Sequence, residues 1–325
     1  MNAFLGELGR RLAERWVTLL LLPGALFVAV VTVASVLGHG RALDLRGLSA
    51  WIDGLAASRG AGQPGIVVLV AAGGLAAAAG TGLAAAALGE GVALLWAAEG
   101  RRGPGRRLAA RRRERWRRAY AEVVAARRAV ALSAVPPHGA DPEARAALRA
   151  ALERCRRICP VPADRPTWIG DRLRAADLRV HHAYRVDLAA LWPRLWLALP
   201  DPARAELTEA YAAYRASARL TGWGLLYLLV AFWWWPAVVI AVVTSGTAWV
   251  RARGAAESLA DLVEGAVDLY GRDVAAALGV LPADEGLDRV SGDAVSALLR
   301  KDEALHPGAE GRAGVPGPAG QPDLA

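Results

Sequence analysis

The chain has 325 residues, a formal net charge of +8, and 54% hydrophobic residues beside 22% charged ones. Its two cysteines are too few for a disulfide framework, which excludes the disulfide-stapled class of small protein. The charged residues lie in blocks separate from the apolar ones, a pattern typical of a membrane protein.

Residues 1–98 carry an amphipathic segment and two uncharged runs, which together predict a membrane hairpin. Residues 1–15 place Phe4, Leu8 and Leu12 on one helical face, as in a helix that lies on a bilayer surface. Residues 16–37 are 22 residues without a charge, longer than the apolar part of a secretory signal. We therefore expect an uncleaved transmembrane helix there.

The second uncharged run, residues 65–89, follows Pro64 and consists mainly of Ala and Gly. Small residues four apart, such as Gly74 and Ala78, allow another helix in lipid to approach closely. We expect a second span at 65–89 and a candidate contact between copies of the chain along it. The pattern that begins at Gly80 has no strand before it, so no dinucleotide cofactor is expected.

Glu90 follows this run and has two interpretations. A carboxylate inside the bilayer would be a functional group, for instance along a transport path. A carboxylate at the end of a span marks the level of the lipid headgroups. We favour the headgroup level, and keep Glu90 as the candidate intramembrane carboxylate.

Residues 99–219 predict an arginine-rich helical domain in the cytoplasm. Residues 101–118 alone hold ten arginines and one acid, and positive charge stays on the cytoplasmic side of a membrane. These arginines suit anionic lipids, at about 1 kcal/mol for each residue near the surface. Nucleic acid is the less favoured partner, because the bilayer offers a nearer anionic surface.

Cys155 and Cys159 lie one turn apart in a helix that Asp141 is expected to cap, with Pro142 at its first position. Together with the adjacent His181 and His182 they suggest a metal site as one interpretation. However, adjacent histidines point to different faces of a helix, and the cysteine spacing is not a strong zinc signature. We favour core packing of the cysteines, with no metal.

The most distinctive soluble segment spans residues 167–196. It contains Thr-Trp-Ile-Gly-Asp-Arg-Leu-Arg-Ala-Ala from Thr167, Tyr-Arg-Val-Asp from Tyr184, and Trp-Pro-Arg-Leu-Trp from Trp192. This set resembles an uncharacterised family of bacterial multi-pass membrane proteins, in which it reads roughly Thr-x-x-Gly-Asn-x-Leu, Tyr-Gly-x-Asp and Trp-Pro-Arg-Leu. The chain departs from that pattern with Asp171 for Asn and Arg185 for Gly. The resemblance implies two membrane hairpins around a cytoplasmic helical domain, and no known activity.

The candidate functional or structural positions in these motifs are Gly170, Asp171, Tyr184, Asp187, Trp192, Pro193 and Arg194. We interpret the two aspartates as helix caps or as partners of arginines. The two tryptophans at 192 and 196 are expected in the cytoplasmic core or at the membrane interface. A catalytic pair of Asp187 and His182 is less favoured, because no nucleophile motif accompanies it.

Residues 220–250 are 31 residues without a charge. A hairpin that breaks at Trp235-Pro236 keeps the flanking arginines on the cytoplasmic side, and proline suits the first turn of the returning helix. Each arm would have about 15 uncharged residues, which is short for a span. A single long, tilted span is the alternative.

Residues 251–305 predict cytoplasmic amphipathic helices with an acidic stripe that includes Asp261 and Glu264. The region 251–325 has a net charge of −6, while 99–219 has 26 arginines against 13 acids, or +13. Opposite charges in one compartment should associate, so we expect the two regions to dock. Residues 306–325 are rich in Gly and Pro and predict a disordered tail.

The sequence thus predicts an all-α integral membrane protein of the cell membrane, with two transmembrane hairpins and a helical cytoplasmic domain between them. Both termini are expected in the cytoplasm. The favoured function is a membrane-anchored interaction or scaffolding module with an unidentified protein partner. A small oligomeric transporter or channel is the alternative, and a membrane-bound enzyme is weaker still. No catalytic, cofactor-binding or metal-binding residue is expected.

Overall fold

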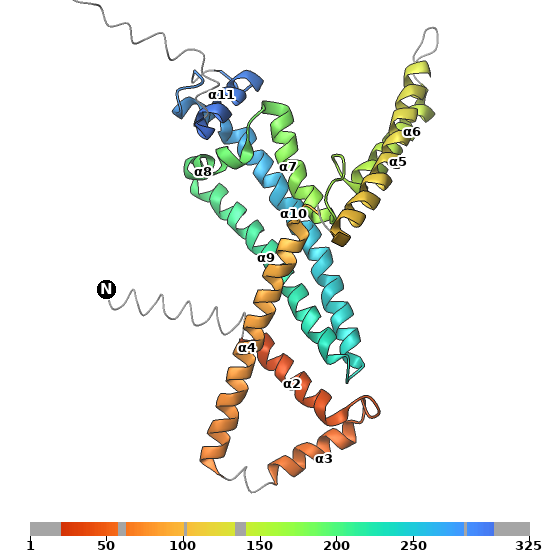
Figure 1. The fold of residues 1–325 in the computed structure, drawn as a ribbon, viewed down its shortest axis with the longest axis vertical. Coiled ribbons are helices and arrows are strands. Elements are labelled where there is room, and N and C mark those ends of the chain that lie inside the picture. Colours follow the sequence, from red (N-terminus) through yellow and green to blue (C-terminus); the bar gives the residue numbers. More distant parts are fainter. Residues whose placement is uncertain (1–20, 58–62, 101–102, 134–140, 283–284, 302–325) are drawn as a thin grey trace, which may run out of the picture. The chain divides into compact units, whose positions relative to one another are not determined.

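The computed structural model describes residues 21–57, 63–100, 103–133, 141–282 and 285–301. Their regular secondary structure is α-helical, which confirms the expected all-α class (Figure 1). The amphipathic helix expected at 1–15 and the tail expected at 306–325 lie outside the described residues. The helices are α2 (Leu22–Leu37), α3 (Leu45–Ala56), α4 (Pro64–Ala97), α5 (Gly103–Ser133), α6 (Pro142–Ile158), α7 (Trp168–Tyr184), α8 (Leu188–Ala198), α9 (Asp201–Val230), α10 (Pro236–Ala277) and α11 (Arg289–Arg300).

Several helices begin at residues whose side chains satisfy the free N–H groups of the first turn. The Asp141 carboxylate accepts a hydrogen bond from the Glu143 N–H at 2.9 Å, and Pro142 takes the first position of α6. Asp288 and Ser291 cap α11 reciprocally, because each side chain binds the backbone N–H of the other residue. The start of α6 is therefore where the Asp-Pro pair predicts it.

Among the described helices, α4 alone is long and apolar enough to cross a membrane, with a mean hydropathy of 2.1 over its most apolar window. The apolar helix α2 has 16 described residues and is shorter than a full span. Residues 220–250 are divided, since α9 ends at Val230 and α10 begins at Pro236. Length and composition thus support one crossing helix in the described chain.

The break between α9 and α10 extends over residues 231–235, which is wider than the single point expected at Trp235-Pro236. Proline disfavours helical backbone at the residue before it and has no N–H to continue a helix, so one helix does not run unbroken through Trp235-Pro236. Counted from Leu220, α9 therefore has only eleven uncharged helical residues, against the fifteen or so expected.

The chain forms two compact units. Unit 1 comprises Met1–Ala175 and Glu206–Ala260, and unit 2 comprises Ala176–Ala205 and Asp261–Ala325. The middle region of the sequence, 99–219, is consequently divided between the two units.

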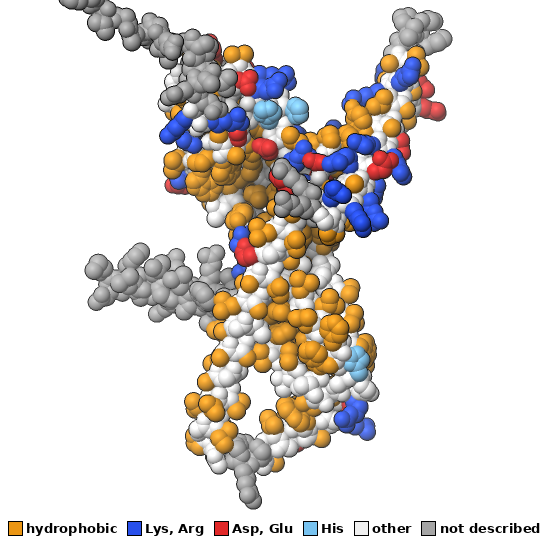
Figure 2. All heavy atoms as spheres, viewed as in Figure 1, with side chains coloured by type: hydrophobic (Ala, Val, Ile, Leu, Met, Phe, Trp, Pro, Cys, Tyr) orange, Lys and Arg blue, Asp and Glu red, His pale blue; other side chains and the backbone are white. Residues whose placement is uncertain are grey.

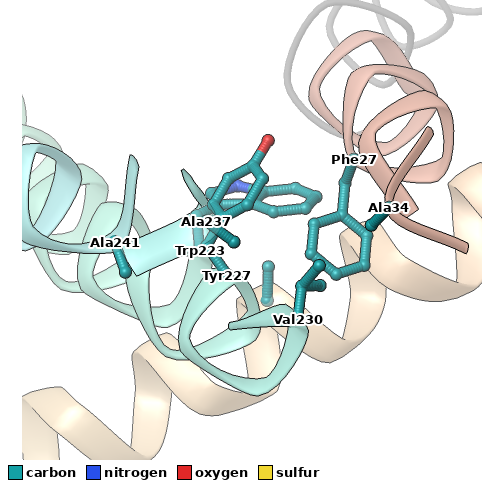
Figure 3. Close-up of a cluster of buried hydrophobic side chains, with 8 residues drawn as sticks. Phe27, Ala34, Trp223, Tyr227, Val230, Ala237 and Ala241 are labelled. Carbon is teal, nitrogen blue, oxygen red and sulfur yellow. The ribbon is translucent and has the colours of Figure 1, made fainter. Parts of the chain in front are cut away.

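Four helices of unit 1 share one apolar core. Figure 3 shows Phe27 of α2 close to Tyr227 and Val230 of α9, and the Phe27 and Tyr227 rings meet edge to face with centroids 5.2 Å apart. At the turns, the Trp234 Nε1–H donates to the Ala42 carbonyl at 3.1 Å. The α2–α4 and α9–α10 pairs therefore form a single bundle. Its buried core residues are Phe27, Ala34, Ala85, Trp223, Tyr227, Val230, Ala237 and Ala241.

Glycines allow the backbones of this bundle to touch. A Cβ added at Gly222 of α9 would overlap the Ala85 carbonyl of α4, and a Cβ at Gly89 would lie 2.7 Å from the Arg219 Cα. Gly24 of α2 makes the same kind of close approach to the Ala78 backbone of α4. Part of the small-residue face of α4 is therefore used for helix packing inside the chain.

In unit 1, α5 and α6 pack against each other along a separate apolar seam. The Trp116 and Tyr120 rings of α5 stack with centroids 4.8 Å apart, and Arg154 of α6 pairs with Glu122 of α5 at 3.0 Å. The arginine-rich segment is thus half of a helical pair. The buried residues of the seam are Ala119, Val123, Ala151 and Cys155.

In unit 2, α8 packs against α11. A Cβ at Gly292 of α11 would overlap the carbonyl of Tyr184, the last residue of α7, so α11 also touches the end of α7. Arg179 of α7 pairs with Glu264 of α10 and lies 3.9 Å from Asp261, so both acids named in the predicted stripe have a basic partner from 99–219.

Candidate functional site

Asp171 has the most completely built environment of the motif residues. Its side chain is fully buried, and its Oδ1 accepts the backbone N–H groups of Asp164 and Arg165 at 2.9 and 2.8 Å. Its Oδ2 accepts Nε and Nη2 of Arg112 at 3.1 and 2.8 Å. Four donors therefore engage both oxygens, and the charge of the carboxylate has a guanidinium partner.

The partners of Asp171 tie α5 to the end of α6. The same Arg112 Nη2 donates to the Ile158 carbonyl at 3.3 Å, and the Trp116 Nε1–H donates to the Cys159 carbonyl at 3.1 Å. These carbonyls belong to the last residue of α6 and the one after it, where a helix leaves acceptors without partners. The ion pair of Arg112 and Asp171 thus fixes the α5–α6 helices to the start of α7.

The start of α7 is also fixed to the end of α4. The Thr167 hydroxyl donates to the Trp96 carbonyl at 2.6 Å and accepts the Gly170 N–H at 2.9 Å. A Cβ at Gly170 would lie 2.5 Å from the same carbonyl, so only glycine fits. Arg165 donates to the Ala97 carbonyl beside it. The start of the first motif therefore forms a junction of α4, α5, α6 and the first part of α7, within unit 1.

An apolar cluster lies under this junction. Trp96 of α4 and Ile169 of α7 are buried against α9 and α10, and the Arg253 guanidinium lies over the Trp168 ring, 4.3 Å from its centroid. The buried residues of the cluster are Val92, Ala93, Trp96, Ile169, Tyr214, Ala218, Ala252 and Ala256.

Glu90 pairs with Arg215 of α9 at this same end of the bundle. Its side chain is 50% exposed, and the Arg215 side chain is 38% exposed. A half-exposed pair of this kind is typical of a polar boundary and contributes little stability. In the sequence, Glu90 is the first charge after the uncharged part of α4.

The remaining motif residues lie in unit 2. The Tyr184 hydroxyl donates to Asp268 Oδ1 at 2.9 Å, and the pKa of this tyrosine is raised by burial and by that carboxylate. Trp192 stands 6.1 Å from Trp196, centroid to centroid, and Arg194 is exposed with its Nη1 donating to the Ala190 carbonyl. Pro193 lies inside α8. The motif thus divides into a unit 1 part and a unit 2 part.

Asp187 has both of the roles considered for it. Its carboxylate caps α8 by accepting the Ala190 N–H at 3.2 Å, and it accepts Nε of Arg300 from α11 at 2.8 Å. The Arg300 hydrogen bond is the main cause that lowers the pKa of Asp187 below its usual range. Arg300, like Arg112, is 59 or more residues from its partner in sequence, so spacing could not identify either.

The Asp187–Arg300 ion pair should make the stability of α11 depend on pH. The pKa of Asp187 is lower in the folded chain than in the unfolded chain. The stability that Asp187 contributes to folding is therefore fully present above its unfolded pKa of about 3.9, and is lost as the pH falls through its folded pKa. We expect hydrogen exchange of the α11 amides, corrected for intrinsic rates, to accelerate below about pH 4 in the native chain. An Arg300→Gln variant should exchange faster at neutral pH and lose part of that dependence. Identical profiles for both proteins would contradict the assignment.

Arg185 has a backbone conformation that favours glycine. It follows the last residue of α7 with a φ of 59°, the left-handed conformation usual at the residue that ends a helix. A residue with a Cβ is strained there by roughly 1–2 kcal/mol.

We therefore expect Arg185→Gly to raise the free energy of unfolding by about 1 kcal/mol, because glycine removes the Cβ strain. Arg185→Ala is the matched control, since it removes the charged side chain but keeps the Cβ. Chemical unfolding in mild detergent measures both. If both variants raise the free energy of unfolding equally, the effect comes from the lost charge rather than from backbone conformation.

Both cysteines are free and buried, and Cys155 belongs to the α5–α6 seam. Burial raises the pKa of Cys159 to about 11, so its thiol is protonated at neutral pH. Within the described residues, no group of three or more His, Cys, Asp or Glu side chains has the arrangement of a metal site. His181 and His182 lie in the last turn of α7.

Comparison with protein-family models, curated proteins and solved structures finds no match to this chain. Chemically, the Asp171 junction is suited to holding elements together. Four donors already occupy both oxygens of the carboxylate.

Proposed function

We propose that the chain is a membrane-anchored interaction module whose bundle of α2, α4, α9 and α10 crosses the bilayer as two hairpins. The observation that carries this proposal is apolar surface on the outside of the bundle. In the most apolar window of α4, only 11% of the residues are buried. A core helix of a soluble protein would be mostly buried, and soluble proteins rarely leave such patches open to water.

The same surface continues over α9 and α10, as the hydrophobic side chains in Figure 2 illustrate. On α10, Val242 and Val243 are 65% and 61% exposed, while Ala237 and Ala241 of the same helix are buried in the bundle core. Lipid is the solvent that suits an apolar outer face around a core of small residues. The exposed apolar residues of these helices include Val67, Val68, Leu69, Val70, Leu75, Leu225, Leu228, Leu229, Val238 and Val239.

Charge defines where the bilayer would end. The Glu90–Arg215 pair and Arg219 stand at one end of the uncharged segments, with Arg251 and Arg253 on α10. An arginine boundary fits the cytoplasmic face. The eleven uncharged residues of α9 span about 17 Å, so the arginines must reach outward or the bilayer must thin locally. Because Glu90 pairs with Arg215 of the same chain, this pairing supports a position at the level of the lipid headgroups rather than along a transport path.

The α5–α6 pair is the part that would meet a partner. Its seam and the Asp171 junction fix it to the end of α4, and its outer face carries exposed arginines such as Arg107, Arg111 and Arg115. A fixed, basic helical surface beside a membrane suits binding better than catalysis, because it presents charge without a reactive group.

Photo-crosslinking in native membranes tests this function. A crosslinking residue replaces Arg111 on α5 in one full-length variant and Val242 on the lipid-facing side of α10 in the other. We expect a discrete protein adduct at position 111 and only lipid adducts at position 242. No protein adduct at 111, or the same adducts at both positions, would refute an interaction role for α5–α6.

A further inference from the structure

A cavity of about 500 Å³ in unit 1 has a strongly basic wall. Four arginines line it, with only two carboxylates, Glu99 and Asp164, against them. The lining residues therefore carry an excess of two positive charges. The lining arginines are Arg106, Arg113, Arg165 and Arg174.

The fold positions these arginines through contacts already present. Arg113 pairs with Asp164, and Arg174 lies 3.8 Å from the other oxygen of that carboxylate. The Arg113 hydrogen bond is the main cause that lowers the pKa of Asp164. Asp164 therefore stays charged and holds two guanidinium groups side by side at the cavity wall.

One wall residue has an unused donor. Arg165 binds the Ala97 carbonyl through Nη1, but its Nε–H is buried and has no hydrogen-bond partner among the described residues. A buried N–H without an acceptor is unfavourable, so the Arg165 guanidinium at the cavity wall has hydrogen-bonding capacity that the chain does not use. Arg106 completes the wall at the end of the first turn of α5, near the positive end of that helix's dipole.

We propose that this cavity binds a phosphate group of an anionic ligand. Phosphate oxygens accept hydrogen bonds from several guanidinium groups at once, and the planar fork of arginine matches them in pairs. Glu99 and Gly100, which follow the end of α4, line the cavity, so the headgroup of an anionic phospholipid is one source of the phosphate. Free phosphate is the other source with the same chemistry. The lipid source rests on the proposed membrane location, whereas the phosphate site itself does not.

The test is a titration of the full-length chain in dodecylmaltoside with dihexanoyl phosphatidylglycerol, followed by thermophoresis. We expect binding that is at least tenfold tighter than for dihexanoyl phosphatidylcholine, because the choline cation meets the arginine wall. Inorganic phosphate that competes at equal concentration would identify the free anion as the ligand and still support the site. Failure of phosphate to compete would identify the lipid headgroup.

Three variants assign binding to the cavity. Arg106→Ala removes one wall cation, and Arg165→Lys keeps the charge but removes the unused Nε–H, so both should weaken binding about tenfold. Arg127→Ala, an exposed arginine of the same helix outside the cavity, should bind within twofold of the native chain. Native affinity in both cavity variants, or an equal loss of affinity in Arg127→Ala, would overturn the proposal. Either result leaves the membrane location to be judged separately, by side-specific labelling.

Discussion

Replacement of Asp171 by alanine is expected to lower the free energy of unfolding by about 3 kcal/mol or more, because it removes the acceptor for a mostly buried arginine. The Arg112 side chain is only 20% exposed, and two backbone N–H groups would also lose their acceptor. Asp171→Asn should cost less, since its amide oxygen still accepts from the backbone. The α5–α6 pair should become the first part of the chain to be cleaved by protease.

Chemical labelling of the two buried cysteines measures this loss of stability. A thiol-reactive dye labels Cys155 and Cys159 only when the α5–α6 region opens, so labelling during heating or denaturant titration follows unfolding. Asp177→Asn, an exposed aspartate on the same helix, is the control and should change stability by less than about 0.5 kcal/mol. If the Asp171→Ala and Asp177→Asn variants unfold at the same midpoint, the Arg112–Asp171 pair does not hold α5 and α6 to the start of α7.

Gly222→Ala is the second change for which we expect a large effect. In an open helix position, alanine in place of glycine gains up to about 1 kcal/mol. At Gly222, however, the new methyl group would overlap the Ala85 carbonyl and lie 3.0 Å from the Gly89 backbone nitrogen. Backbone atoms cannot turn aside as a side chain can. We therefore expect a loss of about 1–3 kcal/mol from overpacking, and a larger loss for Gly222→Leu.

Gly80→Ala on α4 is the matched control, because a Cβ there meets nothing within 4 Å. It should be neutral or stabilising in the same detergent, measured by loss of the folded peak in size-exclusion chromatography after heating. If both alanine variants behave alike, α4 and α9 do not cross at Gly222.

Local patterns predicted the helices well, because caps and uncharged runs are encoded by neighbouring residues. The start of α6 at Asp141-Pro142 and the break of residues 220–250 before Pro236 both follow from backbone chemistry within a few positions. The continuity of α10 did not follow, since the expected boundary at residue 250 was drawn from charge alone. The helix runs on to Ala277, because arginine is a good helix former and does not end a helix.

The contacts of the candidate site were not predictable in this way. The role of Asp171 depends on Arg112, 59 residues earlier, and one arginine among many gives no signal of its partner. Gly170 did carry a signal, because glycine near the start of a helix often marks a close backbone approach, here to the Trp96 carbonyl. The division of the motif between two units could not be read from its thirty residues, which are continuous in sequence.

Side-specific labelling of two single cysteines tests the crossing of the bilayer most directly. Gly40→Cys, in the turn after α2, and Gly254→Cys, on α10 beyond the arginines, are both exposed with open space for a side chain. Each is introduced into a full-length chain in which Cys155 and Cys159 are replaced by alanine. With a membrane-impermeant maleimide on intact cells, we predict labelling of position 40, and of position 254 only after permeabilisation. Labelling of position 254 in intact cells, or equal protection of both positions, would contradict the two-hairpin topology.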